Sequence, residues 1–391
     1  MKCLMLYWDH PQMVVQSVAR NITNALENNG CEVISTSINN TNAGSVICES
    51  INDGIDIIYT LNPTALLIDT GNNIKLFSRI TTTMFVHMLD SPIYFINTPG
   101  FIEMTRANNI VFVAPDSEWL SFLHKYCGVK LTRLLFIPFG APINSETISG
   151  QQKWDFVFFG TLDKTLAKIS FNPSVFRDKP YAKALGLGYF YDLLNTSVNS
   201  DIGASYQFWQ QKLLDINPSN SIAALCEIDS YLKALKRWTI AKQLLRLKDC
   251  KVCFIGGGWE EAFGGTHNFT FINSAPYDDQ FKIFQLSKVV INCDPNFVFG
   301  IHDRVYNALM VKSRIITNNN IYSRHLRESG YIIGLYSADG SDFLDSSIDT
   351  LNFKDSDLEY NQILALTYDT WDSRMSKLLA YNKLLQDKHI L

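Results

Sequence analysis

Several features that define common protein classes are missing from this sequence of 391 residues. The eight cysteines are scattered, and Cys250 and Cys253 form a single CxxC without the second pair that a zinc site needs. No apolar run approaches the roughly 18 residues of a membrane span, and the apolar core of the first ten residues is too short for a signal peptide and predicts a buried first strand instead. We therefore expect free thiols, no transmembrane segment, no bound metal and a cytoplasmic location.

An excess of basic residues is also missing. Lysine and arginine total 34 against 38 aspartate and glutamate residues, which makes the net charge −4. Tight binding to nucleic acid is driven by counterion release from a basic face, so nucleic acid is not the expected partner. The apolar fraction of 47% is nevertheless that of a folded globular protein, and the length predicts two domains.

Short apolar runs alternate with helical stretches in the first third of the chain. Residues 2–7 and 32–37 have the pattern of strands, and residues 12–28 between them have the pattern of a helix. Further strands are predicted at residues 56–59, 83–88, 109–113 and 134–137. This alternation is typical of a parallel sheet, which predicts a Rossmann-like domain over residues 1–145 and a linker over 140–153.

The same alternation resumes after the linker and predicts a second Rossmann-like domain over residues 154–360. Its strands are predicted at residues 154–160, 251–255, 269–272, 289–293 and 313–317, and its helices at 228–246, 278–286 and 303–311. An aromatic-rich stretch at about 170–225 predicts a helical insertion of unclear order. Helical spacing from Tyr360 to Leu385 predicts a C-terminal helical segment over residues 361–391. Periodicity alone does not separate this bilobed α/β plan from that of periplasmic binding proteins.

Five motifs in the second half of the chain carry a family resemblance. They are Arg237 in a helix, FIGGGW at 254–259, SKVVIN at 287–292, GIHDRVYNA at 300–308 and IITN at 315–318. In order and spacing they resemble the CgeB-like, spore-maturation-type glycosyltransferases. The resemblance implies the GT-B architecture, in which two Rossmann-like parallel-sheet domains face a cleft and a C-terminal helix follows.

The resemblance also implies an activity. It predicts transfer of a sugar from a nucleotide-activated donor to an acceptor hydroxyl on a glycan, a protein or a small molecule, with the nucleotide-sugar as substrate and no cofactor. Two alternatives keep the same fold: a non-catalytic sugar-nucleotide-binding protein and a sugar-nucleotide epimerase. The former would bind nucleotide without transfer, and the latter would convert the donor without an acceptor.

The motif at 300–308 predicts a site for the donor diphosphate. Gly300 opens a loop that runs into a helix starting at Asp303, so that backbone N–H groups and the positive helix end point at the ligand. Arg304 can make a bidentate contact to phosphate, and His302 can donate to a phosphate oxygen. Asn307, one turn further on, can reach a ribose hydroxyl, although many relatives carry Glu there. The structural alternative is that Arg304 pairs with a surface carboxylate and that His302 caps the helix.

Four other residues are candidates for donor binding. Gly256 and Gly257 end an apolar strand, where glycines allow close approach of a ligand or a tight turn. Gly160 ends the first strand of the second domain, where a side chain would intrude on the donor. Tyr277 precedes a helix and can stack on the nucleotide base. For each of these residues a purely structural role in a turn or in packing stays open.

The catalytic base is expected at a strand end of the first domain. Asp90 follows the strand at 83–88 in an Asp-Ser-Pro turn, which resembles a segment of several inverting GT-B enzymes, including phage DNA glucosyltransferases. His10 and Asp9 follow the first strand and are alternatives, and an ordinary Asx turn is the structural alternative for Asp90. The E-x7-E pair of retaining relatives is replaced by Phe299 and Asn307, which favours inversion. With no D-x-D metal signature at a strand end, a metal-independent mechanism is expected.

Overall fold

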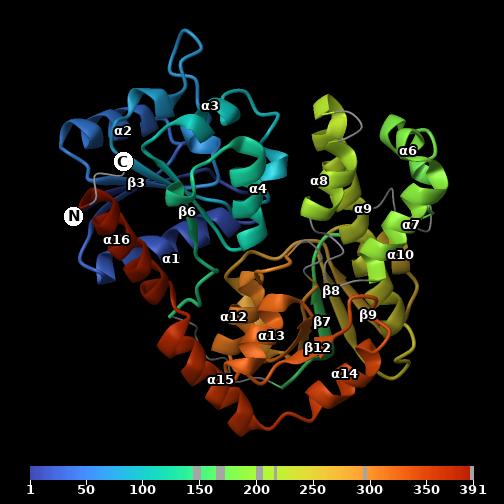
Figure 1. The fold of residues 1–391 in the computed structure, drawn as a ribbon. Coiled ribbons are helices and arrows are strands. Elements are labelled where there is room, and N and C mark those ends of the chain that lie inside the picture. Colours follow the sequence, from blue (N-terminus) through green and yellow to red (C-terminus); the bar gives the residue numbers. More distant parts are fainter. Residues whose placement is uncertain (144–150, 164–171, 200–205, 215–217, 294–296, 388–391) are drawn as a thin grey trace. The chain divides into compact units, whose positions relative to one another are not determined.

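The computed structural model describes residues 1–143, 151–163, 172–199, 206–214, 218–293 and 297–387. Contacts divide the chain into two compact units (Figure 1). Unit 1 comprises Met1–Pro142 and Tyr368–Leu391, and unit 2 comprises Ile143–Thr367. None of the described helices is both long enough and apolar enough to cross a membrane.

Unit 1 contains a six-stranded sheet in the order β2-β1-β3-β4-β5-β6, and every neighbouring pair is parallel. Its strands are β1 (Lys2–Tyr7), β2 (Glu32–Ser37), β3 (Ile57–Leu61), β4 (Thr83–His87), β5 (Ile110–Ala114) and β6 (Leu134–Phe136). Strands β3 and β5 are buried along their whole length, as expected for parallel strands that are covered on both faces. The strand order turns back between β1 and β3, where such sheets bind ligands.

The helices of unit 1 are α1 (Val14–Asn28), α2 (Ala43–Asn52), α3 (Phe101–Arg106), α4 (Ser117–Cys127) and α16 (Trp371–Asp387), with short 3-10 turns at Thr64–Leu67, Leu76–Arg79, Pro92–Tyr94 and Leu131–Arg133. Of these helices, α1, α2 and α4 pack on the sheet, whereas α16 packs along α1 and α3 packs against α4. Helix α4 shows how the sequence sets the ends. The Asp116 side chain accepts the Glu118 N–H at 2.7 Å, and Gly128, with φ of 72°, ends the helix.

The C-terminal helical segment consists of two helices rather than one continuous stretch. Helix α15 (Asp355–Tyr368) lies in unit 2, apart from its last residue, whereas α16 lies in unit 1. Between them the backbone pairs with Ala141, whose N–H donates to the Asp369 carbonyl at 2.7 Å and whose carbonyl accepts from the Trp371 N–H at 3.2 Å. This pairing takes backbone groups that a continuous helix would use internally, which is why the helical spacing is interrupted here.

Unit 2 contains a second six-stranded parallel sheet, in the order β12-β11-β10-β7-β8-β9. Its strands are β7 (Trp154–Phe159), β8 (Val252–Ile255), β9 (Phe269–Ile272), β10 (Ser287–Ile291), β11 (Arg314–Asn318) and β12 (Gly334–Tyr336). The predicted strands are confirmed, and the three-residue β12 was missed. This order is that of the Rossmann fold, with its reversal between β7 and β10.

Four helices of unit 2 begin within the aromatic-rich stretch at about 170–225: α6 (Pro180–Leu185), α7 (Leu187–Asn199), α8 (Tyr206–Leu214) and α9 (Pro218–Leu244). The helices that follow are α10 (Trp259–Phe263), α11 (Asp279–Gln285), α12 (Asp303–Met310), α13 (Ile321–Glu328) and α14 (Phe343–Leu351), and then α15. The insertion packs around its own aromatic cluster, in which the ring of Phe190 lies 5.6 Å from that of Trp209 and 5.2 Å from that of Phe176. Helix α9 then continues into the Rossmann-like part of unit 2.

Candidate functional site

The start of α12 carries most of the predicted donor-binding residues. His302 is the residue that caps the helix, with extended backbone (φ −71°, ψ 148°), and its Nδ1 lies 3.3 Å from the Arg304 N–H. The side chain is 37% exposed. The loop before it is anchored by the buried Asn320, whose amide donates to the carbonyls of Phe297 and Gly300 at 3.0 Å each. The predicted helix and its polar start are therefore both present.

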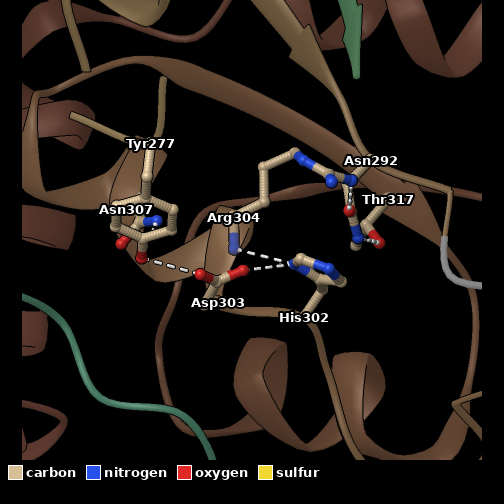
Figure 2. Close-up of polar contacts among 7 residues, drawn as sticks. All are labelled: Tyr277, Asn292, His302, Asp303, Arg304, Asn307 and Thr317. Atoms are coloured by element: carbon tan, nitrogen blue, oxygen red, sulfur yellow. Dashed lines mark hydrogen bonds and ion pairs between the residues drawn. The ribbon is translucent and has the colours of Figure 1, made fainter. Parts of the chain in front are cut away.

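A chain of polar contacts runs from the partly exposed His302 to the buried Asp303, Tyr277 and Asn307 (Figure 2). His302 Nδ1 contacts one carboxylate oxygen of Asp303, and the other accepts the Tyr277 hydroxyl at 2.7 Å. Asn307 in turn donates to the Tyr277 hydroxyl oxygen at 2.8 Å. Burial on its own would raise the pKa of Asp303, but His302, Tyr277 and Arg304 outweigh it and lower that pKa to about 2. Asp303 is therefore ionised at neutral pH.

Arg304 points from the same helix start toward Asn292, which follows β10 (Figure 2). Its guanidinium donates to the Asn292 side-chain oxygen at 2.9 Å and lies 5.6 Å from the centre of the Phe159 ring. Asn292 follows β10 and is held by Thr317 Oγ1 at 2.9 Å, whereas Phe159 is the last residue of β7. Arg304 therefore contacts the two strands between which the sheet order reverses.

Gly160 and Gly256 lie where the ends of β7 and β8 approach each other. A Cβ on Gly256 would lie 2.3 Å from the Gly160 carbonyl oxygen, and its φ of +130° favours glycine. A Cβ on Gly160, at φ +146°, would lie 3.0 Å from Arg237 Nε. Gly257 has open space, with only Thr161 Cγ2 at 3.9 Å. Gly256 is thus required by the backbone, whereas Gly160 makes room for a cationic side chain.

Arg237 is a residue of this site that the sequence did not single out for donor binding. It comes from α9, donates through Nη1 to the Thr161 carbonyl at 2.7 Å, and has a buried Nε without a hydrogen-bond partner among the described residues. Arg304 and Arg237 therefore bring two guanidinium groups to the end of β7. The signal was present in the sequence, because Arg237 heads the series of motifs, but nothing in the motif says which way the side chain points.

Tyr277 is 2% exposed, and its hydroxyl is used by Asp303 and Asn307. Burial and the neighbouring Asp303 carboxylate hold the pKa of this phenol well above its usual range. The buried Tyr277 ring orients Asp303 through its hydroxyl and has no exposed face on which a nucleotide base could stack. This favours a packing role for Tyr277 over base stacking. Asn307 is fully buried, and its Oδ1 has no hydrogen-bond partner among the described residues.

In unit 1, Asp90 follows β4 and is exposed. Its Oδ2 accepts the side-chain amide of Asn62 at 2.9 Å. Asn62, the residue after β3, is, like Arg237, a site residue that the sequence did not single out, since a polar residue before a proline is typical of any turn. Among the described residues, no backbone N–H that follows Asp90 donates to its carboxylate, as an Asx turn would require; instead Ser91 Oγ accepts the Ile93 N–H at 3.4 Å.

The two alternatives to Asp90 lie in the turn after β1. Asp9 is exposed, and its backbone N–H donates to Asn39 Oδ1 at 2.9 Å. His10 Nδ1 accepts the Gln12 N–H at 3.2 Å, which ties this imidazole to its own turn. Both residues lie beside the reversal of the strand order, at β1. No group of three or more His, Cys, Asp or Glu side chains suited to a metal ion occurs in the described ranges.

Comparison with known proteins shows similarity at the level of structure only. No family model and no curated protein matches the sequence. A sucrose-phosphate synthase from Thermosynechococcus elongatus superposes with a TM-score of 0.58 at 8% identity, over 99% of this chain and 100% of that one. HepE of Anabaena, in complex with UDP and glucose, superposes with a TM-score of 0.52 at 11% identity, over 99% of each chain.

A third similar structure is an alpha-glucosyltransferase in complex with UDP and a 13-mer DNA that contains an HMU base. Its TM-score is 0.54 at 10% identity, over 98% of this chain and 99% of that one. The chain has the GT-B fold. The predicted fold class, with two Rossmann-like parallel sheets, is thereby confirmed. The end of β7 and the start of α12 both lie in unit 2, which contains the more C-terminal of the two Rossmann-like sheets.

Proposed function

We propose that this chain is a glycosyltransferase that moves a sugar from a nucleoside-diphosphate donor to an acceptor hydroxyl. The observation that carries the proposal is the position of Arg304, whose guanidinium contacts both Phe159 of β7 and Asn292 after β10. A Rossmann-type sheet binds its ligand at the reversal of its strand order, and these are the two strands on either side of that point. The neighbours solved with UDP have the same fold.

The charges at this place suit a diphosphate. Arg304 and Arg237 bring two guanidinium groups to the end of β7, and His302 adds a partly exposed imidazole at the start of α12. Guanidinium groups bind phosphate through charge-assisted hydrogen bonds and remain charged at all physiological pH values. These cations would stabilise the negative charge that grows on the nucleotide as the sugar leaves. The proposed mechanism assigns this role to side chains and needs no metal ion.

Unit 1 would supply the general base. Asp90 is the preferred candidate, because its carboxylate is exposed at a strand end and ordered by the buried Asn62. The base would take the proton of the acceptor hydroxyl as its oxygen attacks the anomeric carbon, and the bond from that carbon to the diphosphate would break. A single displacement of this kind inverts the anomeric configuration. His10 is the less favoured candidate, since its Nδ1 already accepts a backbone N–H.

A finer assignment is to the CgeB-like family, which the five motifs between Arg237 and Asn318 support. Their residues form the site described above: the helix with Arg237, the glycine turn after β8, Asn292 after β10, the start of α12 and Thr317 in β11. The acceptor proposed is a hydroxyl of a glycan, a protein or a small molecule, because the net charge of −4 gives little support for binding a long nucleic acid. The eight cysteines are free thiols, as suits the cytoplasm.

The test is nucleotide binding, measured by calorimetry with UDP, GDP, ADP and TDP. Wild-type protein is expected to bind at least one of them, and Arg304→Ala to weaken that binding by about 30- to 1000-fold, or about 2–4 kcal/mol. Arg304→Lys is expected to fall between them, since it keeps the charge and loses the planar fork. The matched control is Arg314→Ala, at the amino end of β11, where the guanidinium donates to the Phe353 carbonyl at 2.7 Å.

The outcomes separate the alternatives. Unchanged binding in a folded Arg304→Ala variant rules out the assigned phosphate site. If the wild type binds nucleotide but transfers no sugar and hydrolyses no donor, the non-catalytic binding protein replaces the transferase. Conversion of the donor sugar without any acceptor indicates the epimerase instead.

A further inference from the structure

Asn62 is buried in unit 1, directly after β3, and it is 1% exposed. Its backbone is left-handed, with φ of +55°, a conformation that asparagine tolerates better than most residues. The backbone of Asn62 is itself fixed, because its N–H donates to the His87 carbonyl at 2.8 Å and its carbonyl accepts the Thr60 hydroxyl at 3.3 Å. The side chain is therefore held firmly at the carboxyl ends of β3 and β4.

Every polar atom of the Asn62 side chain is directed at the turn that carries Asp90. Asn62 Oδ1 accepts the backbone N–H groups of Leu89 at 2.7 Å and of Asp90 at 3.2 Å. Asn62 Nδ2 donates to Asp90 Oδ2 at 2.9 Å. Within the described part of the chain this is the only hydrogen bond to the Asp90 carboxylate. One amide thus fixes both the backbone and one carboxylate oxygen, and the second oxygen is left for a proton.

The other titratable groups at these two strand ends bring no charge. Burial lowers the pKa of His87 to about 3, so its imidazole is neutral at physiological pH. Burial also holds the pKa of Tyr59 well above its usual range, and its hydroxyl lies 2.6 Å from His87 Nδ1. The nearest polar influence on the Asp90 carboxylate is therefore the neutral amide of Asn62.

We infer that Asn62 is a positioning residue for sugar transfer: it holds the Asp90 carboxylate in the orientation in which its second oxygen accepts the proton of the acceptor. The inference rests on the proposed function and adds a residue to it. The hydrogen bond from the Asn62 amide occupies one oxygen of the Asp90 carboxylate and fixes its direction. A base held in one orientation also loses less rate to misplacement, because small errors in position are costly in catalysis.

The test compares Asn62→Asp with wild type in a transfer assay over the pH range 5–9. The new carboxylate can still accept the Leu89 and Asp90 N–H groups, so the turn keeps its backbone contacts. It can no longer donate, and it places a second negative charge against Asp90. We expect kcat near neutral pH to fall about 10- to 100-fold with KM for the donor nearly unchanged, and the acidic limb of the pH–rate profile to move up by about one unit.

Asn109→Asp is the matched control. Asn109 is an amide clamp at the opposite end of β4, where its Nδ2 donates to the Ile80 carbonyl at 2.8 Å and to the Thr82 carbonyl at 3.1 Å. The same substitution there should lower stability and leave the pH–rate profile where it is in wild type. Asn62→Gly, which accepts the left-handed backbone but removes the amide, should lower kcat as Asn62→Asp does.

The results distinguish the two levels of the argument. An active wild type together with an unchanged profile in Asn62→Asp overturns the positioning role and leaves the proposed function intact. An equal shift in Asn109→Asp assigns the effect to general loosening of unit 1 and also overturns it. A wild-type protein that transfers no sugar from any donor overturns the proposed function, and the inference with it.

Discussion

His87 makes the stability of unit 1 depend on pH. The imidazole is fully buried at the end of β4, stacked on Phe139 at 6.0 Å and edge-on to Trp371, the first residue of α16, at 5.9 Å. Burial lowers its pKa from 6.5 to about 3. Replacing it with phenylalanine keeps an aromatic ring among these neighbours and removes the titratable group.

The expected magnitude follows from the difference between the two pKa values. Below pH 6.5 the unfolded chain binds a proton at His87 that the folded chain rejects until about pH 3, so acid favours unfolding. The stability lost relative to neutral pH is about 2 kcal/mol at pH 5 and about 3 kcal/mol at pH 4. In His87→Phe this part of the acid dependence should disappear, although the variant starts from a lower stability because Tyr59 loses its partner.

The assay is urea unfolding at pH 8, 6, 5 and 4, followed by hydrogen exchange of the peptides that contain β3, β4 and β5, which report on unit 1 alone. The free energy of wild type should fall more steeply between pH 6 and pH 4 than that of His87→Phe. His124→Gln, at an exposed position of α4, is the control and should keep the wild-type slope. Equal slopes for wild type and His87→Phe would refute the reasoning.

Two further variants test the assigned roles. Asp90→Asn should retain nucleotide affinity, because the proposed phosphate site lies in unit 2, while kcat falls about 10²- to 10⁴-fold. In a separate measurement, proton NMR of the product that wild type forms from an α-linked donor should show a β linkage. An α-linked product would contradict inversion. Gly256→Ala should lower the free energy of unfolding by about 2–4 kcal/mol, because its Cβ would lie 2.3 Å from the Gly160 carbonyl oxygen, whereas Gly257→Ala should be tolerated; equal melting temperatures for the two variants would contradict the backbone role of Gly256.

Much of the fold could be predicted from local patterns. Buried parallel strands appear as continuous apolar runs, and the strands predicted in both sheets are present, as is the helix at the start of the phosphate motif. The three-residue β12 was missed because Gly334–Tyr336 is too short to carry a pattern. The break between α15 and α16 was missed because it depends on pairing with Ala141, which lies more than 200 residues earlier in the chain.

The candidate site was predictable only where a motif carries its own geometry. The spacing from Gly300 to Asn307 indicated a polar helix start, and His302 does cap α12. It did not indicate that Tyr277 would be buried against Asp303, since that contact joins residues 26 apart. Asn62 and Arg237 were missed for the same reason: each acts through a partner that is brought close only by the fold.

The most direct test of the central claim is hydrogen exchange of the whole protein with and without the nucleoside diphosphate that binds best. The account predicts protection in peptides that cover the end of β7, Arg237 and the start of α12 at His302 and Arg304. Peptides around Lys312, which lies near the amino ends of β10 and β11 in the same sheet, should exchange at an unchanged rate. Protection confined to other regions, or no change at saturating nucleotide, would contradict the claim that this site binds the donor.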